Sequence, residues 1–179
     1  MIDLKSDLQE QQMLKALDSA ITQHHMKQRF DRAALALDHA LAADPDLLLA
    51  WQTVPLESYG LTLPDIIQSS WVFILRANVA TLPERHPNSH QRMMVHRGQG
   101  DFQIWDNGSW QSNLLLSDFN APLDRRWVSI PANVWHRSVK PAENLVVVSF
   151  HTATEDELIE ENGDPATSEP THRRKYAEI

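Results

Sequence analysis

The chain has 179 residues, 42% of them hydrophobic and 22% charged, with a formal net charge of −8, and this length suits one domain with an appendage. The acidic balance argues against nucleic acid as a partner, because phosphate binding requires clustered Lys and Arg, and the absence of cysteine excludes disulfides and thiolate ligands. No apolar run approaches the length of a membrane span and the N-terminus lacks a signal segment, so a cytoplasmic protein without a membrane partner is expected.

Residues 1–70 are predicted to form a helical segment that packs on the rest of the chain. Ser6 and Gln9 have the spacing of a helix N-cap and its capping-box partner, and the helix that follows is expected to reach about His25. Its apolar side chains recur at the spacing of one helix face: Leu14, Leu17 and Ile21.

A second helix is predicted from about Phe30 to Ala43, with one apolar stripe along it. The stripe consists of Phe30, Ala34, Leu37 and Leu41. Pro45 ends this helix, because proline disfavours helical backbone at the residue before it, and residues 47–51 are predicted to add a short helical turn. A single helical pair cannot bury its own apolar face, so we expect it to pack on the following domain or at a dimer contact.

Residues 71–153 have the pattern of an all-β domain. The stretch WVFILRANVATL, which begins at Trp71, is rich in β-branched and aromatic residues and favours a buried strand. DFQIW alternates polar and apolar residues, and the Asn107-Gly108 pair after it predicts a type I′ hairpin. LVVVSFH, at residues 145–151, follows a further turn. Short strands separated by turns are typical of β-sandwiches and barrels.

The last part of the chain, residues 154–179, is predicted to lie outside the core. Thr154–Glu161 begins with threonine and carries acidic residues in its first turn, which favours a short helix. The residues after it are polar and contain proline, so a flexible tail is expected.

Two stretches of the β region concentrate side chains that can bind a metal ion. The first, Pro83–Gly98, has four of them within eight positions: Glu84, His86, His90 and Gln91. The second, Ile130–His136, places a histidine five residues after Pro131, where a strand restarts. Because residues two apart in a strand share a face, Glu84 and His86 can point at the same ion.

Together the two stretches resemble the paired motifs of the cupin superfamily. The first cupin motif has two histidines one residue apart, a glutamate and a glycine, and the matching positions are Glu84, His86, Gln91 and Gly98. The second has a proline, a glycine and a histidine, which match Pro131, Asn133 and His136.

The resemblance covers roughly residues 71–151 and implies a mainly β fold, a single cupin barrel of the double-stranded β-helix or jelly-roll type. The N-terminal helices would form an appendage to it. The resemblance also implies one divalent metal ion, such as Fe, Mn, Ni or Zn, and its implied ligands are Glu84, His86, Gln91 and His136.

The implied ligand set departs from the family pattern at two positions, and one alternative stays open. The family's ligand set has three histidines and one glutamate, and the set implied here has two histidines, one glutamate and one glutamine. Both sets of ligands carry the same formal charge, which favours a metal site with exchanged ligands over the loss of the site. Strand alternation places Gln91 on the ligand-bearing face, but a one-residue bulge would turn His90 inward instead. The same alternation directs four nearby side chains away from that face: Arg92, His96, Trp135 and Arg137.

Three classes of function fit such an ion, because two imidazoles and two oxygen ligands leave positions for water, O₂ or a chelating substrate. The first class is an oxidoreductase with dioxygenase-like chemistry at a mononuclear Fe(II)- or Mn(II)-type centre, acting on a small polar metabolite. The others are a metal-assisted isomerase or lyase and a non-catalytic small-molecule-binding or regulatory protein. A homodimer is expected, because exposed sheet edges need cover.

Overall fold

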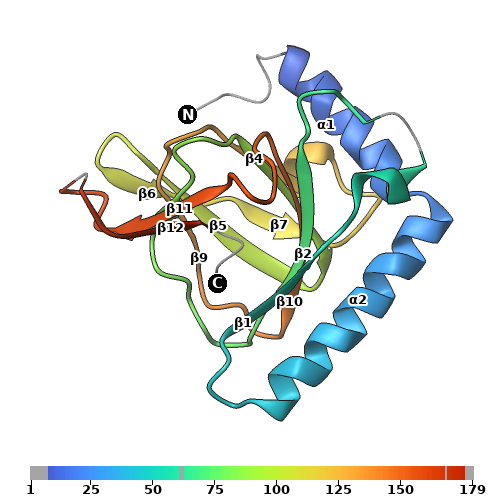
Figure 1. Cartoon of the computed structure of the whole chain (residues 1–179), viewed down its shortest axis with the longest axis horizontal. Coiled ribbons are helices and arrows are strands. Elements are labelled where there is room, and N and C mark those ends of the chain that lie inside the picture. Colours follow the sequence, from blue (N-terminus) through green and yellow to red (C-terminus); the bar gives the residue numbers. More distant parts are fainter. Residues whose placement is uncertain (1–7, 61–62, 168, 176–179) are drawn as a thin grey trace.

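A computed structural model describes residues 8–60, 63–167 and 169–175 (Figure 1). Two helices, α1 (Leu8–Ile21) and α2 (His24–Ala43), precede a series of short strands. Helix α2 ends where Asp44 takes up extended backbone before proline. The predicted cap Ser6 lies outside the described residues. Within those residues, neither helix combines the length and the apolar character needed to cross a membrane.

The first sheet has five strands in the order β1-β2-β10-β4-β8, and all neighbouring pairs are antiparallel. Two 3-10 helices, η1 (Leu56–Tyr59) and η2 (Leu123–Arg125), lie in the connections between strands. The strands of this sheet are β1 (Leu49–Thr53), β2 (Ser69–Leu75), β4 (Gln91–Arg97), β8 (Trp127–Ile130) and β10 (Leu145–His151).

The second sheet has seven strands, in the order β12-β11-β3-β9-β5-β6 with β7 paired to β5. The β5–β6 hairpin turns at Asn107 and Gly108, whose φ angles of 49° and 79° confirm the predicted type I′ turn. The strands are β3 (Glu84–Arg85), β5 (Gln99–Asp106), β6 (Ser109–Gln111), β7 (Leu114–Leu116), β9 (His136–Ser138), β11 (Ile159–Gly163) and β12 (Pro170–Lys175).

The chain crosses repeatedly from the first sheet to the second, from β2 to β3, β4 to β5, β8 to β9 and β10 to β11. The two sheets therefore face one another as in a jelly roll, and both contribute to one apolar core between them. That core includes Val95 of β4, Phe102 of β5, Leu115 of β7 and Val147 of β10. The predicted mainly β, jelly-roll fold class is confirmed.

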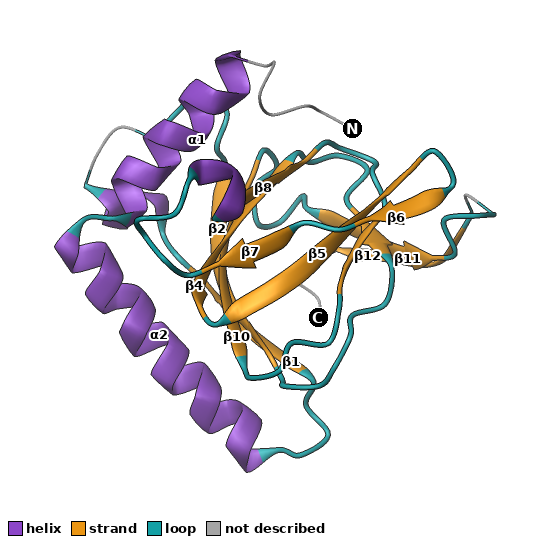
Figure 2. Cartoon of the chain, turned by 180° about the vertical axis from the view of Figure 1, so that it is seen from behind, coloured by secondary structure: helices purple, strands orange, loops and turns teal. Residues whose placement is uncertain are grey.

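Both helices lie against the outer face of the five-stranded sheet (Figures 1 and 2). The apolar stripe of α2 packs there on outward side chains of the strands, so it is covered within one chain. Polar contacts also join the two layers, because Arg92 of β4 makes two 2.7 Å hydrogen bonds to Glu10 of α1. His96 lies 2.8 Å from the Asp31 carboxylate of α2. Arg92 and His96 thus point outward, as predicted.

Two helical predictions are wrong. Residues 47–51 add no helical turn, because Leu49–Thr53 pairs as edge strand β1 with β2. Thr154–Glu161 is not a helix either: a turn leads into β11, and β12 returns beside it in the region predicted to be a flexible tail. Ion pairs of 2.8 Å, from Arg174 to Glu160 and from Arg173 to Glu161, join these two strands.

A chain truncated after Gly163, which lacks β12, is therefore expected to melt at a lower temperature than the full chain. The deletion removes Arg174 from Glu160, and it removes Arg173 from Glu161, which keeps its ion pair with Arg85. Both glutamates are 3% exposed, and a buried polar group without its partner costs about 1–3 kcal/mol. For a chain of this size each kcal/mol corresponds to about 2–4 °C. Calorimetry of this variant measures the loss, and truncation after Lys175, which keeps β12, is the control. Equal melting temperatures for both truncations would restore the flexible-tail interpretation.

Candidate metal centre

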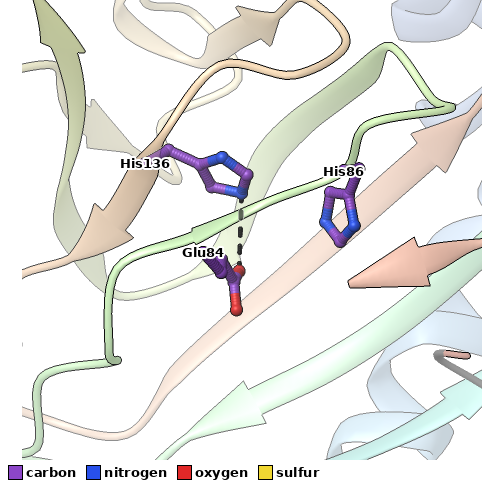
Figure 3. Close-up of side chains that lie close together, drawn as sticks. All are labelled: Glu84, His86 and His136. Atoms are coloured by element: carbon purple, nitrogen blue, oxygen red, sulfur yellow. Dashed lines mark ion pairs between the residues drawn. The ribbon is translucent and has the colours of Figure 1, made fainter. Parts of the chain in front are cut away.

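Three of the four predicted ligands meet at the adjoining ends of β3 and β9. The register places Glu84 of β3 directly opposite His136 of β9, and His86 follows Glu84 on the same side of the chain. One ligand atom from each side chain lies within 4.8 Å of the others. Figure 3 shows the two imidazoles and the carboxylate pointing toward a common centre, with Glu84 Oε1 3.4 Å from His136 Nε2.

Both imidazoles are held by the backbone through the same ring nitrogen. His86 Nδ1 lies 2.9 Å from the Ile159 carbonyl, and His136 Nδ1 lies 3.0 Å from the Val134 carbonyl. A carbonyl can only accept a hydrogen bond, so each Nδ1 carries the proton and each Nε2 keeps its lone pair. This is the arrangement by which proteins orient metal-binding histidines.

The electrostatics of the centre keep the His86 imidazole neutral and the Glu84 carboxylate charged. Burial, with the neighbouring His136, lowers the pKa of His86 to about 4. Burial by itself would raise the pKa of Glu84, but His136, His86 and Arg174 nearby outweigh it and lower that pKa. At neutral pH Glu84 is thus a carboxylate and His86 a neutral imidazole, which are the protonation states that a metal ion requires of these two groups.

Gln91, the fourth predicted ligand, lies on the inner face at the start of β4. It pairs across the sheet with Ile130 of β8 and His151 of β10, and the ring of His151 touches that of His86 at a centroid distance of 5.1 Å. Gln91 therefore borders the cluster. Its Oε1 is buried and makes no hydrogen bond to the described residues.

His90, the alternative ligand, is on the other side of the sheet. Its Nε2 lies 2.7 Å from Ser129 Oγ and 4.0 Å from the Glu10 carboxylate of α1. Burial and the charge of Arg92 lower its pKa to about 4. The strand has no bulge at this point, since Gln91 and Arg92 pair with consecutive residues of β8, so His90 faces the helices.

The sequence analysis overlooked three polar residues near the cluster. His151 ends β10 and belongs to neither motif, although the alternation of LVVVSFH places it on the inward face with Val147. Glu160 and Arg174 come from the strands predicted as helix and tail. Burial and the charge of Glu84 raise the pKa of Glu160 to about 6.

The loop of the second motif is hydrogen-bonded directly to the first motif. The Asn133 N–H donates to the His86 carbonyl at 2.8 Å. Asn133 occupies the glycine position and has a φ of 65°, a left-handed backbone that asparagine tolerates better than most residues. The departure from glycine thus keeps the turn. This arrangement of the two motifs in a jelly roll resembles that of the cupins.

No family model and no curated protein matches the sequence. Among solved structures, the coconut allergen cocosin is 19% identical, with a TM-score of 0.47 over 63% of this chain and 28% of that one. A recombinant oxalate oxidase in complex with glycolate is 14% identical, with a TM-score of 0.45 over 59% of this chain and 51% of that one.

The capsular polysaccharide assembling protein CapF from Staphylococcus aureus is also similar, at 14% identity and a TM-score of 0.47, over 63% of this chain and 30% of that one. The match spans about half of the oxalate oxidase chain and less than a third of the other two. These likenesses concern the fold alone, so the chemistry of this protein must be argued from its own side chains.

Proposed function

We propose that this cupin binds one divalent metal ion, of Fe, Mn, Ni or Zn, through Glu84, His86, Gln91 and His136. One observation carries the proposal. Two buried atoms of this set, His136 Nε2 and Gln91 Oε1, have no hydrogen-bond partner among the described residues. An unsatisfied buried polar atom costs about 1–3 kcal/mol, and a metal ion would satisfy both atoms at once.

The donor set suits a first-row transition metal more than Ca²⁺ or Mg²⁺. Two imidazole nitrogens and two oxygens favour Fe, Mn, Ni or Zn, whereas all-oxygen sites favour the alkaline-earth ions. A five- or six-coordinate ion held by these four groups keeps at least one open position. The side chains on the inner wall beyond Gln91 are apolar, as at Met93, Val95 and Ile130, so they would shield a bound ligand from water.

From these properties we infer an oxidoreductase with dioxygenase-like chemistry at a mononuclear Fe(II)- or Mn(II)-type centre. The bound ion would supply the redox chemistry toward O₂ and a small polar metabolite. Glu84, His86, Gln91 and His136 would hold the ion, and the apolar wall would exclude water from it. A homodimer and a small-molecule substrate remain part of this proposal.

Elemental analysis of the protein purified without a histidine tag tests the proposal. About one equivalent of Fe or Mn per chain is expected, followed by oxygen consumption when the metal-loaded protein meets a panel of small hydroxy acids and oxo acids. Metal binding with substrate turnover but no oxygen uptake would replace the oxidoreductase by an isomerase or lyase. A protein that neither retains nor rebinds any of these metals would overturn the metal centre and leave a binding protein.

A further inference from the structure

His151, the last residue of β10, stands beside the proposed metal centre although it lies in neither motif. Its side chain is 1% exposed, and its ring meets that of His86 edge-on with centroids 5.1 Å apart. On the other side of His86, the ring of His136 lies at a centroid distance of 5.4 Å. Three imidazoles from different segments therefore form a continuous group, with His86 in the middle.

The separations of these rings match those of imidazoles that share an ion. A metal–nitrogen bond of about 2.0–2.1 Å places each ring centroid about 3.2 Å from the metal, so angles of about 90–109° separate the centroids by about 4.5–5.2 Å. The observed 5.1 Å and 5.4 Å are within a few tenths of an ångström of this range. The ligand atoms of Glu84, His86 and His136 lie within 4.8 Å of one another, a group that leaves His151 out, so the His151 ring would have to turn toward them to reach a shared ion.

The orientation of His151 is set by a hydroxyl group in the first motif. Its Nδ1 lies 3.3 Å from Ser89 Oγ. That hydroxyl oxygen also accepts the Thr152 N–H at 3.0 Å and lies 3.4 Å from the His90 carbonyl, which can take the hydroxyl proton. With the hydroxyl proton so engaged, Nδ1 of His151 donates to Ser89, and Nε2 keeps its lone pair, as in His86 and His136.

His151 lies on the inner face of the sheet, and within the described residues its side chain forms no ion pair with an acidic group. It pairs across the sheet with Gln91, whose buried Oε1 makes no hydrogen bond to the described residues. His151 and the Gln91 amide oxygen therefore lie side by side near His86. Both could act as ligands of an ion bound there. Gln91 belongs to the first motif, whereas His151 belongs to neither motif and is brought there by the β4–β10 pairing.

We propose that His151 is a third imidazole ligand of the metal ion, contributed by β10. This inference rests on the proposed metal centre. With His151 included, the centre has three imidazoles and the Glu84 carboxylate, and Gln91 completes the shell or holds a bound water. The added nitrogen favours ions that prefer imidazole, such as Fe, Ni, Cu and Zn, over Mn and Mg.

The test counts imidazoles on bound Cu(II) by electron spin echo envelope modulation, in the wild type and in His151→Phe. Phenylalanine keeps an aromatic ring against His86 but removes both nitrogens. Three coupled imidazoles are expected in the wild type and two in His151→Phe, with a loss of Cu(II) affinity of about tenfold or more. His96→Phe is the matched control, since His96 is a histidine of the outer face in edge contact with Phe30.

The outcomes separate this inference from the proposed function. A wild type with two coupled imidazoles and a His151→Phe variant with unchanged affinity would overturn the role of His151 and leave the metal centre intact. A wild type that binds no metal would overturn the centre itself. Metal-free melting temperatures show whether His151→Phe folds; if it does not, His151→Gln replaces it, and a retained third imidazole signal in that variant overturns the proposal.

Discussion

His136→Ala is expected to lose most of its affinity for divalent metal. His136 comes from β9 and supplies the only proposed ligand from the second motif, so it ties that strand to β3 through the ion. Its Nε2 is buried without a hydrogen-bond partner in the described structure. Alanine leaves Glu84 with no imidazole opposite it and removes one of the four proposed ligands.

Thermal unfolding with and without metal measures this loss. Ion at a hundredfold excess over its dissociation constant stabilises the folded protein by about 2.7 kcal/mol, so the wild type should melt higher with Fe(II), Mn(II) or Ni(II). His136→Ala should show almost no shift at the same concentration. An undiminished shift in this variant would remove His136 from the site.

Two further variants are compared with His136→Ala in the same measurement of the metal-dependent melting temperature. His90→Ala is the matched control, because His90 lies on the helix-covered face beside Ser129 and should leave the metal response unchanged. Gln91→Glu replaces an amide oxygen by a carboxylate on the inner face and should tighten binding, since a charged oxygen is the stronger ligand for a divalent ion. Loss of the metal response in His90→Ala would contradict the observed register of β4.

Glu10→Leu is expected to destabilise the folded protein strongly. Glu10 of α1 is 7% exposed and Arg92 of β4 is 4% exposed, and two 2.7 Å hydrogen bonds join them. Arg92 Nη1 already has no hydrogen-bond partner in the described structure, so leucine would leave the whole guanidinium buried without its counter-charge. Removing one partner of a buried ion pair costs about 3–5 kcal/mol.

Chemical denaturation of three variants tests the cause of this loss. Gln12→Leu, on the exposed side of the same helix, makes the same kind of change away from the ion pair and should cost little. The double variant Glu10→Leu/Arg92→Met removes both charges and should recover most of the stability, since buried pairs replaced by apolar residues are often neutral. If the double variant is as unstable as Glu10→Leu, the loss comes from packing and not from the unpaired arginine.

The β domain was predictable because its signals are local. The Asn107-Gly108 turn requires positive φ at both residues, and few other residue pairs allow it. The alternation of β4 places polar Gln91 and apolar Met93 and Val95 on one face, and Arg92 and His96 on the other, and a shift by one residue would reverse every contact. The mainly β character, the inward position of Gln91 and the outward position of Arg92 follow from this periodicity, whereas the jelly-roll topology was implied by the resemblance to cupins.

The errors of the sequence analysis concern segments whose structure depends on distant partners. Residues 154–161 have acidic residues that favour a helix start, yet Glu160 and Glu161 are buried in β11. There Glu160 pairs with Arg174 of β12, and Glu161 pairs with Arg173 of β12 and Arg85 of β3. Edge strand β1 forms because β2 offers it a row of unpaired backbone groups. Neither strand pairing can be predicted from the local sequence pattern.

The sequence by itself determined the alternating strands, the helix stripe and the motif positions of Glu84, His86, Gln91 and His136, because propensity and side-chain period act over a few residues. Only the tertiary structure decided which of these groups meet. It paired Glu84 with His136 across β3 and β9, turned His90 toward the helices and brought His151 beside His86. Strand pairing joins residues far apart in the chain, and its register depends on the packing of the whole domain.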